Sequence, residues 1–96
     1  MILSFKDQAT EDLYNGNRST KALRIPHALW DAARRKLDML NAAYELNDLR
    51  IPPANRLEAL KGTLKGFYSI RINDQFRIVF QWHEHNASSV QIVDYH

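Results

Sequence analysis

The sequence contains no cysteine, which excludes a disulfide framework and a thiolate metal site and suits a reducing cytoplasm. No apolar run approaches the length of a membrane span, and the apolar start at residues 1–6 is too short for a signal-peptide core. A phosphate-binding glycine loop, a nucleophile elbow and a helix-turn-helix signature are also missing. We therefore expect a soluble protein of the cytoplasm that does not associate with a membrane.

The chain of 96 residues is long enough for one hydrophobic core, so residues 1–96 are predicted to form a single domain. Its net charge of +2 is small, but the positive charges are concentrated between residues 50 and 82. In that part of the chain Arg50, Arg56, Lys61, Lys65, Arg71 and Arg77 outnumber the acids Glu58 and Asp74. Such an excess indicates a polyanionic partner, with nucleic acid as the first candidate.

Residues 67–82 are predicted to form a β-hairpin around which the rest of the chain packs. Residues 67–72 and 76–82 are rich in β-branched and aromatic side chains, and the polar triplet at 73–75 has the length of a hairpin loop. Because side chains alternate along a strand, one face of the hairpin is apolar and belongs to the core. That face consists of Tyr68, Ile70, Ile72, Phe76, Ile78, Phe80 and Trp82.

The same register places Arg71 opposite Arg77 on the other face of the hairpin. Like charges in this position destabilise a strand pair. Either an anion lies between the two side chains, and phosphate suits the guanidinium fork, or the two arginines point apart into solvent, or one of them pairs with Asp94. The sequence is compatible with each of these arrangements.

Two helices are predicted before the hairpin. Residues 7–15 form a short helix with acids in its first turns, where they complement the helix dipole, and Gly16 follows its end. Pro26 opens the main helix, which runs to Leu46 and has one wide apolar stripe. The stripe consists of Leu29, Trp30, Ala33, Leu37, Leu40, Ala43 and Tyr44, and we expect Trp30 to anchor the core.

Short strands are expected at 1–5 and 89–93, and an extended segment at 56–60. Residues 18–24 and 51–55 are connectors, and 61–66 and 83–88 are turns. This order predicts an α+β fold, in which a small antiparallel-rich β-sheet carries two N-terminal helices on one face. The opposite face would then hold Arg71, Arg77 and the last residues of the final strand.

The end of the chain contains several groups that can transfer or orient protons. Asp94, Tyr95 and His96 directly follow the last strand, so they are expected at the rim of the sheet beside the hairpin. Histidine and tyrosine transfer protons, aspartate orients or accepts them, and arginine stabilises charge on a phosphate. With Glu58 and the hairpin arginines, these groups would suffice for metal-free cleavage of RNA by its 2′-hydroxyl. The alternative is that the last three residues fray, as chain termini often do.

A metal site has little support in the sequence. His83 and His85 flank Glu84 and could chelate a divalent cation through two imidazoles, but no third ligand lies near them in the sequence. His27 is expected to be a surface or capping residue. We therefore expect neither a metal nor a cofactor.

Five segments of the chain carry a resemblance to a known family, in the right order at the right spacing. These segments are Ile2–Phe5, Lys36–Ala43, Arg56–Gly62, Tyr68–Ile78 and Val93–His96, so the resemblance extends over nearly the whole chain. On these segments the sequence resembles a HigB-type toxin of the RelE/ParE superfamily of bacterial toxin–antitoxin systems.

This resemblance implies a RelE-like fold and a ribosome-dependent mRNA endonuclease that cleaves mRNA in the decoding site, without metal, and so inhibits translation. It also implies a HigA-like antitoxin with a helix-turn-helix domain. The toxin would contact operator DNA only through this antitoxin. The basic connector 18–24 would contact the antitoxin, ribosomal RNA or only water, and the antitoxin is the first hypothesis.

Carried over residue by residue, the resemblance implies a catalytic set of His96, Tyr95, Asp94, Arg77 and Glu58. His96 or Tyr95 would transfer protons, Asp94 would position His96, and Arg77 would neutralise the phosphate in the transition state. Some relatives have histidine where Glu58 stands, so Glu58 either transfers a proton or orients a neighbour or a base. The resemblance implies that Lys61 and Arg71 bind RNA and phosphate, and the local excess of positive charge adds Arg56 and Lys65 to this set.

Two other functions are compatible with the sequence. A ParE-like inhibitor of DNA gyrase shares the fold but needs no acid–base set, so the terminal triplet is evidence against it. An inactive module that acts mainly as a corepressor with its antitoxin is the second alternative, and the intact candidate residues are evidence against that one.

Overall fold

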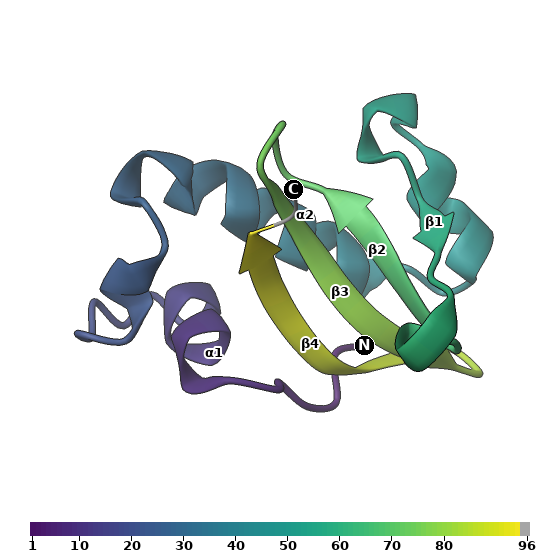
Figure 1. Cartoon of the computed structure of the whole chain (residues 1–96), viewed down its shortest axis with the longest axis horizontal. Coiled ribbons are helices and arrows are strands. Elements are labelled where there is room, and N and C mark those ends of the chain that lie inside the picture. The colour runs from purple at the N-terminus through teal and green to yellow at the C-terminus, as the bar shows by residue number, and fades with distance from the viewer. Residues whose placement is uncertain (95–96) are drawn as a thin grey trace.

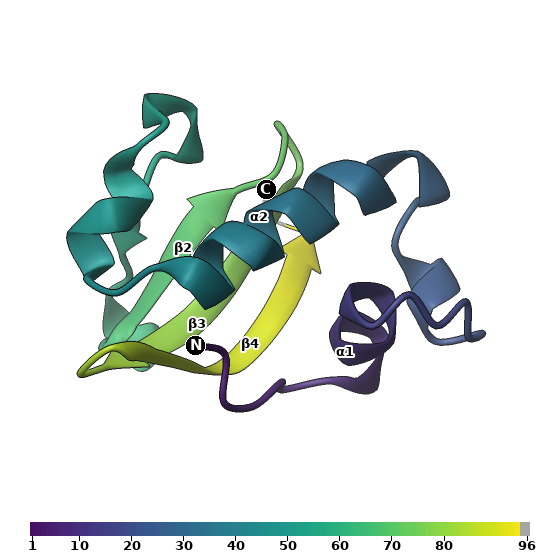
Figure 2. The ribbon, with the colours of Figure 1, turned by 180° about the vertical axis from the view of Figure 1, so that it is seen from behind.

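An antiparallel sheet of four strands lies at the centre of the protein, whose structure is a computed structural model that describes residues 1–94. The strands are β1 (Glu58–Ala59), β2 (Phe67–Arg71), β3 (Phe76–His83) and β4 (Asn86–Asp94), and they lie side by side in this order. The helix α2 (Trp30–Ala42) lies behind the sheet in Figure 1 and in front of it in Figure 2. The shorter helix α1 (Gln8–Tyr14) lies next to the edge strand β4 (Figure 1). The predicted α+β fold is confirmed.

The predicted hairpin is present with the expected register. Arg71 pairs with Arg77, and Ile70 pairs with Ile78, between β2 and β3. The loop is held by Asn73, whose side-chain oxygen accepts hydrogen bonds from the backbone N–H groups of Gln75 (2.9 Å) and Phe76 (2.7 Å), as in an Asx turn. On the apolar face the side chains of Ile70, Phe76, Ile78 and Phe80 are buried, and Tyr68, Ile72 and Trp82 pack against them.

The core between α2 and the sheet uses most of the predicted helical stripe. Ala33, Leu37 and Leu40 are fully buried. Trp30 is also buried, and its indole Nε1–H donates to the carbonyl oxygen of Ile25 at 2.8 Å. Trp30 is therefore the core anchor that the sequence predicts, because its ring is enclosed and its one polar group has a partner.

The main helix is shorter than predicted. A 3₁₀ turn at His27–Leu29 precedes α2, and α2 ends at Ala42 instead of Leu46. The carboxylate of Asp48 accepts the N–H groups of Tyr44 (3.1 Å) and Glu45 (3.0 Å) and thereby caps a new 3₁₀ turn at Leu46–Arg50. This cap competes with continuation of the helix, so the prediction that Tyr44 belongs to the buried stripe is wrong; its side chain is 64% exposed.

The predicted strand boundaries also need correction at both chain ends. Residues 1–5 make only isolated bridges, from Ile2 to Ala87 and from Phe5 to Val90. The predicted turn at 83–88 is too long, because β4 begins at Asn86 and pairs with His83. Among residues 1–94, no helix is long and apolar enough to cross a membrane.

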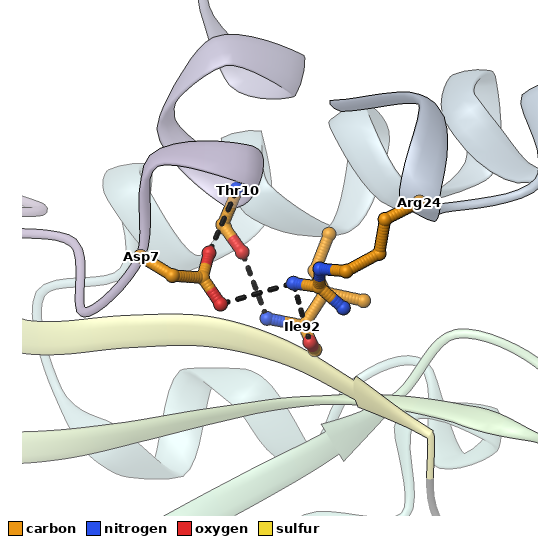
Figure 3. Close-up of polar contacts among 4 residues, drawn as sticks. All are labelled: Asp7, Thr10, Arg24 and Ile92. Carbon is orange, nitrogen blue, oxygen red and sulfur yellow. Dashed lines mark hydrogen bonds and ion pairs between the residues drawn. The ribbon is translucent and has the colours of Figure 1, made fainter. Parts of the chain in front are cut away.

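The outer edge of β4 is covered by other parts of the chain. The backbone N–H groups of Leu3 and Lys6 donate to Ala87 and Val90, each at 2.8 Å. Further along β4, side chains instead of backbone groups pair with the edge. The hydroxyl of Thr10 accepts a hydrogen bond from the N–H of Ile92 at 3.0 Å, and Arg24 Nη2 donates to the Ile92 carbonyl at 3.4 Å (Figure 3). Arg24 also pairs with Asp7, the N-cap of α1, at 3.0 Å. These contacts block strand addition and hold the end of β4 in place.

Candidate functional site

Arg77 lies on the face of the sheet opposite the core and is buried there. Its Nε–H donates to the hydroxyl of Ser69 at 2.9 Å, and its Nη2 donates to the backbone carbonyl of Arg56 at 2.7 Å and to that of Ser69 at 3.4 Å. A buried guanidinium is costly unless hydrogen bonds satisfy it, and these bonds also fix the plane of the group. Arg77 is therefore a positive charge of defined orientation.

Glu58 lies beside this guanidinium. It is on β1 and pairs with Ser69 on β2, and its Oε1 is 3.9 Å from Arg77 Nη2. About half of the Glu58 side chain is exposed, at 51%, so its carboxylate is open to solvent while Arg77 lies beneath. The structure thus brings together two predicted catalytic residues, one that can accept a proton and one that can stabilise a negative charge.

The facing arginines of the hairpin avoid repulsion by binding separate partners. Arg71 Nε donates to the carbonyl of Asn73 at 3.1 Å, and its guanidinium pairs with Asp74 in the loop. Arg77 turns instead toward Ser69 and Arg56. The alternative in which both arginines point apart into solvent is therefore wrong for Arg77, which is buried.

A hollow of about 350 Å³ lies next to Ser69 on the same face of the sheet. Its lining is mainly apolar, with the ammonium-bearing side chain of Lys61 and the carboxamide of Gln91 among the polar exceptions. The full lining is Leu60, Lys61, Leu64, Ser69, Val79, Gln91 and Val93. Of the predicted RNA-binding residues, Lys61 lines this hollow, and Arg71 lies at the hairpin loop. Arg56 and Lys65 are exposed in the segments that flank β1.

Asp94 is the last described residue and lies at the rim of the sheet. It pairs with Phe76 across the strands, and its carboxylate accepts a hydrogen bond from Gln75 Nε2 at 3.1 Å. The predicted catalytic residues Tyr95 and His96 lie outside the described residues.

Sequence reasoning missed Ser69 and Gln91. Ser69 precedes Arg71 by two positions on β2 and therefore lies on the same face of the sheet. This alternation could have placed Ser69 near the arginines. Gln91 is opposite Val79 on the same face of β4.

The two histidines near the β3–β4 turn, His83 and His85, contact different neighbours. The ring of His85 stacks on that of Tyr44, with 3.8 Å between centroids, and its Nδ1 is 2.8 Å from the Tyr44 carbonyl oxygen. His83 lies near Glu84, at 3.7 Å. Within residues 1–94 no group of three or more histidines and acids could hold a metal ion.

Comparison with protein families matches residues 3–96 to the RelE-like toxin of type II toxin–antitoxin system HigB. The chain belongs to the HigB-like toxin family. Among curated proteins, toxin HigB-1 of Vibrio cholerae serotype O1 is 48% identical over 82 residues, which cover 85% of this chain and 84% of that one. The predicted family is therefore confirmed, and this HigB-like chain is a toxin of the type II class.

The fold of this HigB-like toxin is also that of YoeB. YoeB from Staphylococcus aureus, in a heterotetrameric complex with YefM, superposes with a TM-score of 0.61 at 18% identity, over 100% of this chain and 98% of that one. The YoeB dimer from the same organism gives a TM-score of 0.56 at 26% identity, over 99% and 94%. These similarities confirm the predicted RelE-like architecture.

Proposed function

We propose that this toxin is a ribosome-dependent mRNA endonuclease that inhibits translation by metal-free cleavage. The observation that supports this proposal best is the oriented guanidinium of Arg77 beside the solvent-open carboxylate of Glu58, on the face of the sheet opposite the core. A gyrase inhibitor or a corepressor would have no need of such a pair.

In the proposed reaction the 2′-hydroxyl of the RNA attacks the adjacent phosphorus. The bond from phosphorus to the 5′-oxygen breaks, which leaves a 2′,3′-cyclic phosphate and a free 5′-hydroxyl. A base takes the proton of the 2′-hydroxyl, and an acid protonates the leaving oxygen. The phosphate gains negative charge in the transition state, and a cation held in place beforehand stabilises that charge without reorganising.

Arg77 takes the role of this cation, because Ser69 and the Arg56 carbonyl already fix its orientation. Glu58 either accepts a proton or orients the substrate, and Asp94, Tyr95 and His96 complete the acid–base set. Lys61, Arg71, Arg56 and Lys65 attract the RNA backbone, which carries one negative charge per nucleotide.

The proposed partners follow from this activity and from the family. They are the ribosome with its mRNA, and a HigA-like helix-turn-helix antitoxin through which operator DNA is contacted. The complex of YoeB with YefM supports an antitoxin partner for a toxin of this fold. The cytoplasm is the compartment in which these partners meet.

The test is cleavage of mRNA on programmed ribosomes by wild type, Arg77→Ala and a variant without His96. Arg35→Ala, which removes an exposed arginine on α2, is the matched control. We expect cleavage by wild type and control, and a loss of about 10²-fold or more in the other two, which is typical when one charge-stabilising group is removed. A folded wild type that leaves ribosomal mRNA intact but blocks supercoiling by gyrase would replace this proposal with the ParE-like function.

A further inference from the structure

Asn55 is a fully buried polar residue that lies just before the proposed site. Its side-chain Nδ2 donates to the backbone carbonyl of Leu49 at 3.1 Å, and its Oδ1 accepts a hydrogen bond from the ammonium of Lys36. Its backbone N–H donates to Pro52 at 2.9 Å. The carboxamide therefore ties the connector before β1 to both the 3₁₀ turn at Leu46–Arg50 and the helix α2.

Lys36 reaches this carboxamide from α2, on the core side of the sheet. Its side chain is partly buried, and burial together with the neighbouring charge of Arg35 lowers the pKa of Lys36. A partly desolvated ammonium is costly unless a hydrogen bond satisfies it. The hydrogen bond to Asn55 meets this need, and it also gives the buried Asn55 Oδ1 a partner.

The residue after Asn55 has an unusual backbone conformation. Arg56 has φ 46° and ψ 55°, in the left-handed region that residues other than glycine seldom adopt. This conformation turns the Arg56 carbonyl toward Arg77 Nη2, which it meets at 2.7 Å. Glu58, another partner of Arg77, follows two residues later. The segment 55–58 therefore contributes two of the groups that hold the guanidinium.

We propose that Lys36 and Asn55 are positioning residues, which fix the segment 55–58 and through it the orientation of Arg77. The catalytic consequence of this role depends on the proposed function, whereas the effect on Arg77 itself does not. Neither residue lies among those assigned to the site, and Lys36 acts from the opposite side of the sheet.

The experiment replaces Lys36 rather than Asn55, because an Asn55 variant risks failing to fold. Lys36→Met removes the ammonium and keeps most of the aliphatic stem, Lys36→Arg restores a donor, and Arg34→Met, which removes an exposed arginine, is the control on the same helix. The first readout is hydrogen exchange at the Arg77 Nε–H, followed by NMR on the folded toxin. The second is single-turnover mRNA cleavage on ribosomes, with the maximal rate and the half-saturating concentration measured separately.

In Lys36→Met we expect exchange at Arg77 to be about 10-fold faster and the maximal cleavage rate to be about 10- to 100-fold lower, since small displacements of a reacting group have effects of this size. The half-saturating concentration should not change, Lys36→Arg should recover most of the rate, and Arg34→Met should behave as wild type. Wild-type exchange in folded Lys36→Met would overturn the proposal. So would equally fast exchange in Leu13→Val, a core variant in α1, because the effect would then reflect global destabilisation. If the wild type does not cleave mRNA, the proposed function fails while the exchange result still decides the positioning role.

Discussion

The substitution Thr10→Val tests whether side chains stabilise the outer edge of β4. Thr10 is fully buried, and its hydroxyl accepts the N–H of Ile92 at 3.0 Å (Figure 3). Valine has nearly the same shape but no acceptor, so the N–H of Ile92 would remain buried without this partner. Such a loss costs about 1–3 kcal/mol. The added methyl group recovers about 0.8 kcal/mol at most.

The net loss is therefore expected to be about 0.2–2.2 kcal/mol, and each kcal/mol lowers the melting temperature of a domain of this size by about 4–8 °C. Urea unfolding can be followed by the fluorescence of Trp30 and Trp82. The matched control is Thr20→Val, since Thr20 is exposed. The amide of Ile92 should also exchange faster in Thr10→Val only. If Thr10→Val unfolds at the same urea concentration as Thr20→Val, the side-chain closure of this edge does not stabilise the fold.

Three further predictions address the core, the acid stability and the site. Phe80→Ala removes a fully buried ring and should cost about 3–5 kcal/mol in urea unfolding, and a smaller loss would mean that the core relaxes around the cavity. Hydrogen bonds from Ser19 and Gln8 lower the pKa of Asp12. The ionised Asp12 carboxylate therefore stabilises the fold at pH values above the ordinary carboxyl pKa, and this stabilisation is lost as the pH falls through the lowered pKa. Melting temperatures at falling pH should therefore decline less steeply in Asp12→Asn than in wild type, and equal slopes would contradict this. Glu58→Gln should slow cleavage by about 10²–10⁴-fold and remove one limb of the pH–rate profile if Glu58 transfers a proton, whereas an orienting role would leave the profile unchanged.

The hairpin and its faces could be predicted because the information is local. Alternation of side chains determines which face of β2 and β3 is apolar, and the Asn73 loop determines that Arg71 meets Arg77. The apolar stripe of α2 could be predicted for the same reason, since helical spacing alone places Leu37 and Leu40 on one side of the helix.

The partners of Arg77 could not be predicted in this way. The carbonyl of Arg56 reaches Arg77 because Arg56 itself adopts a left-handed conformation. Nothing in the sequence indicates this conformation, since Arg56 is not a glycine. The start of β4 was missed for a similar reason. Asn86 to Ser88 are mostly polar, but Ala87 enters the core and pairs with the backbone of residues 1–3, which lie at the far end of the chain.

The most direct test of the account compares wild-type cleavage of the same mRNA free in solution and bound in programmed ribosomes. We expect a cut within the decoding site of ribosome-bound mRNA, with a 2′,3′-cyclic phosphate at the new end, and little or no cleavage of free mRNA. Intact ribosomal mRNA after incubation with folded toxin, or equal cleavage with and without ribosomes, would contradict the account.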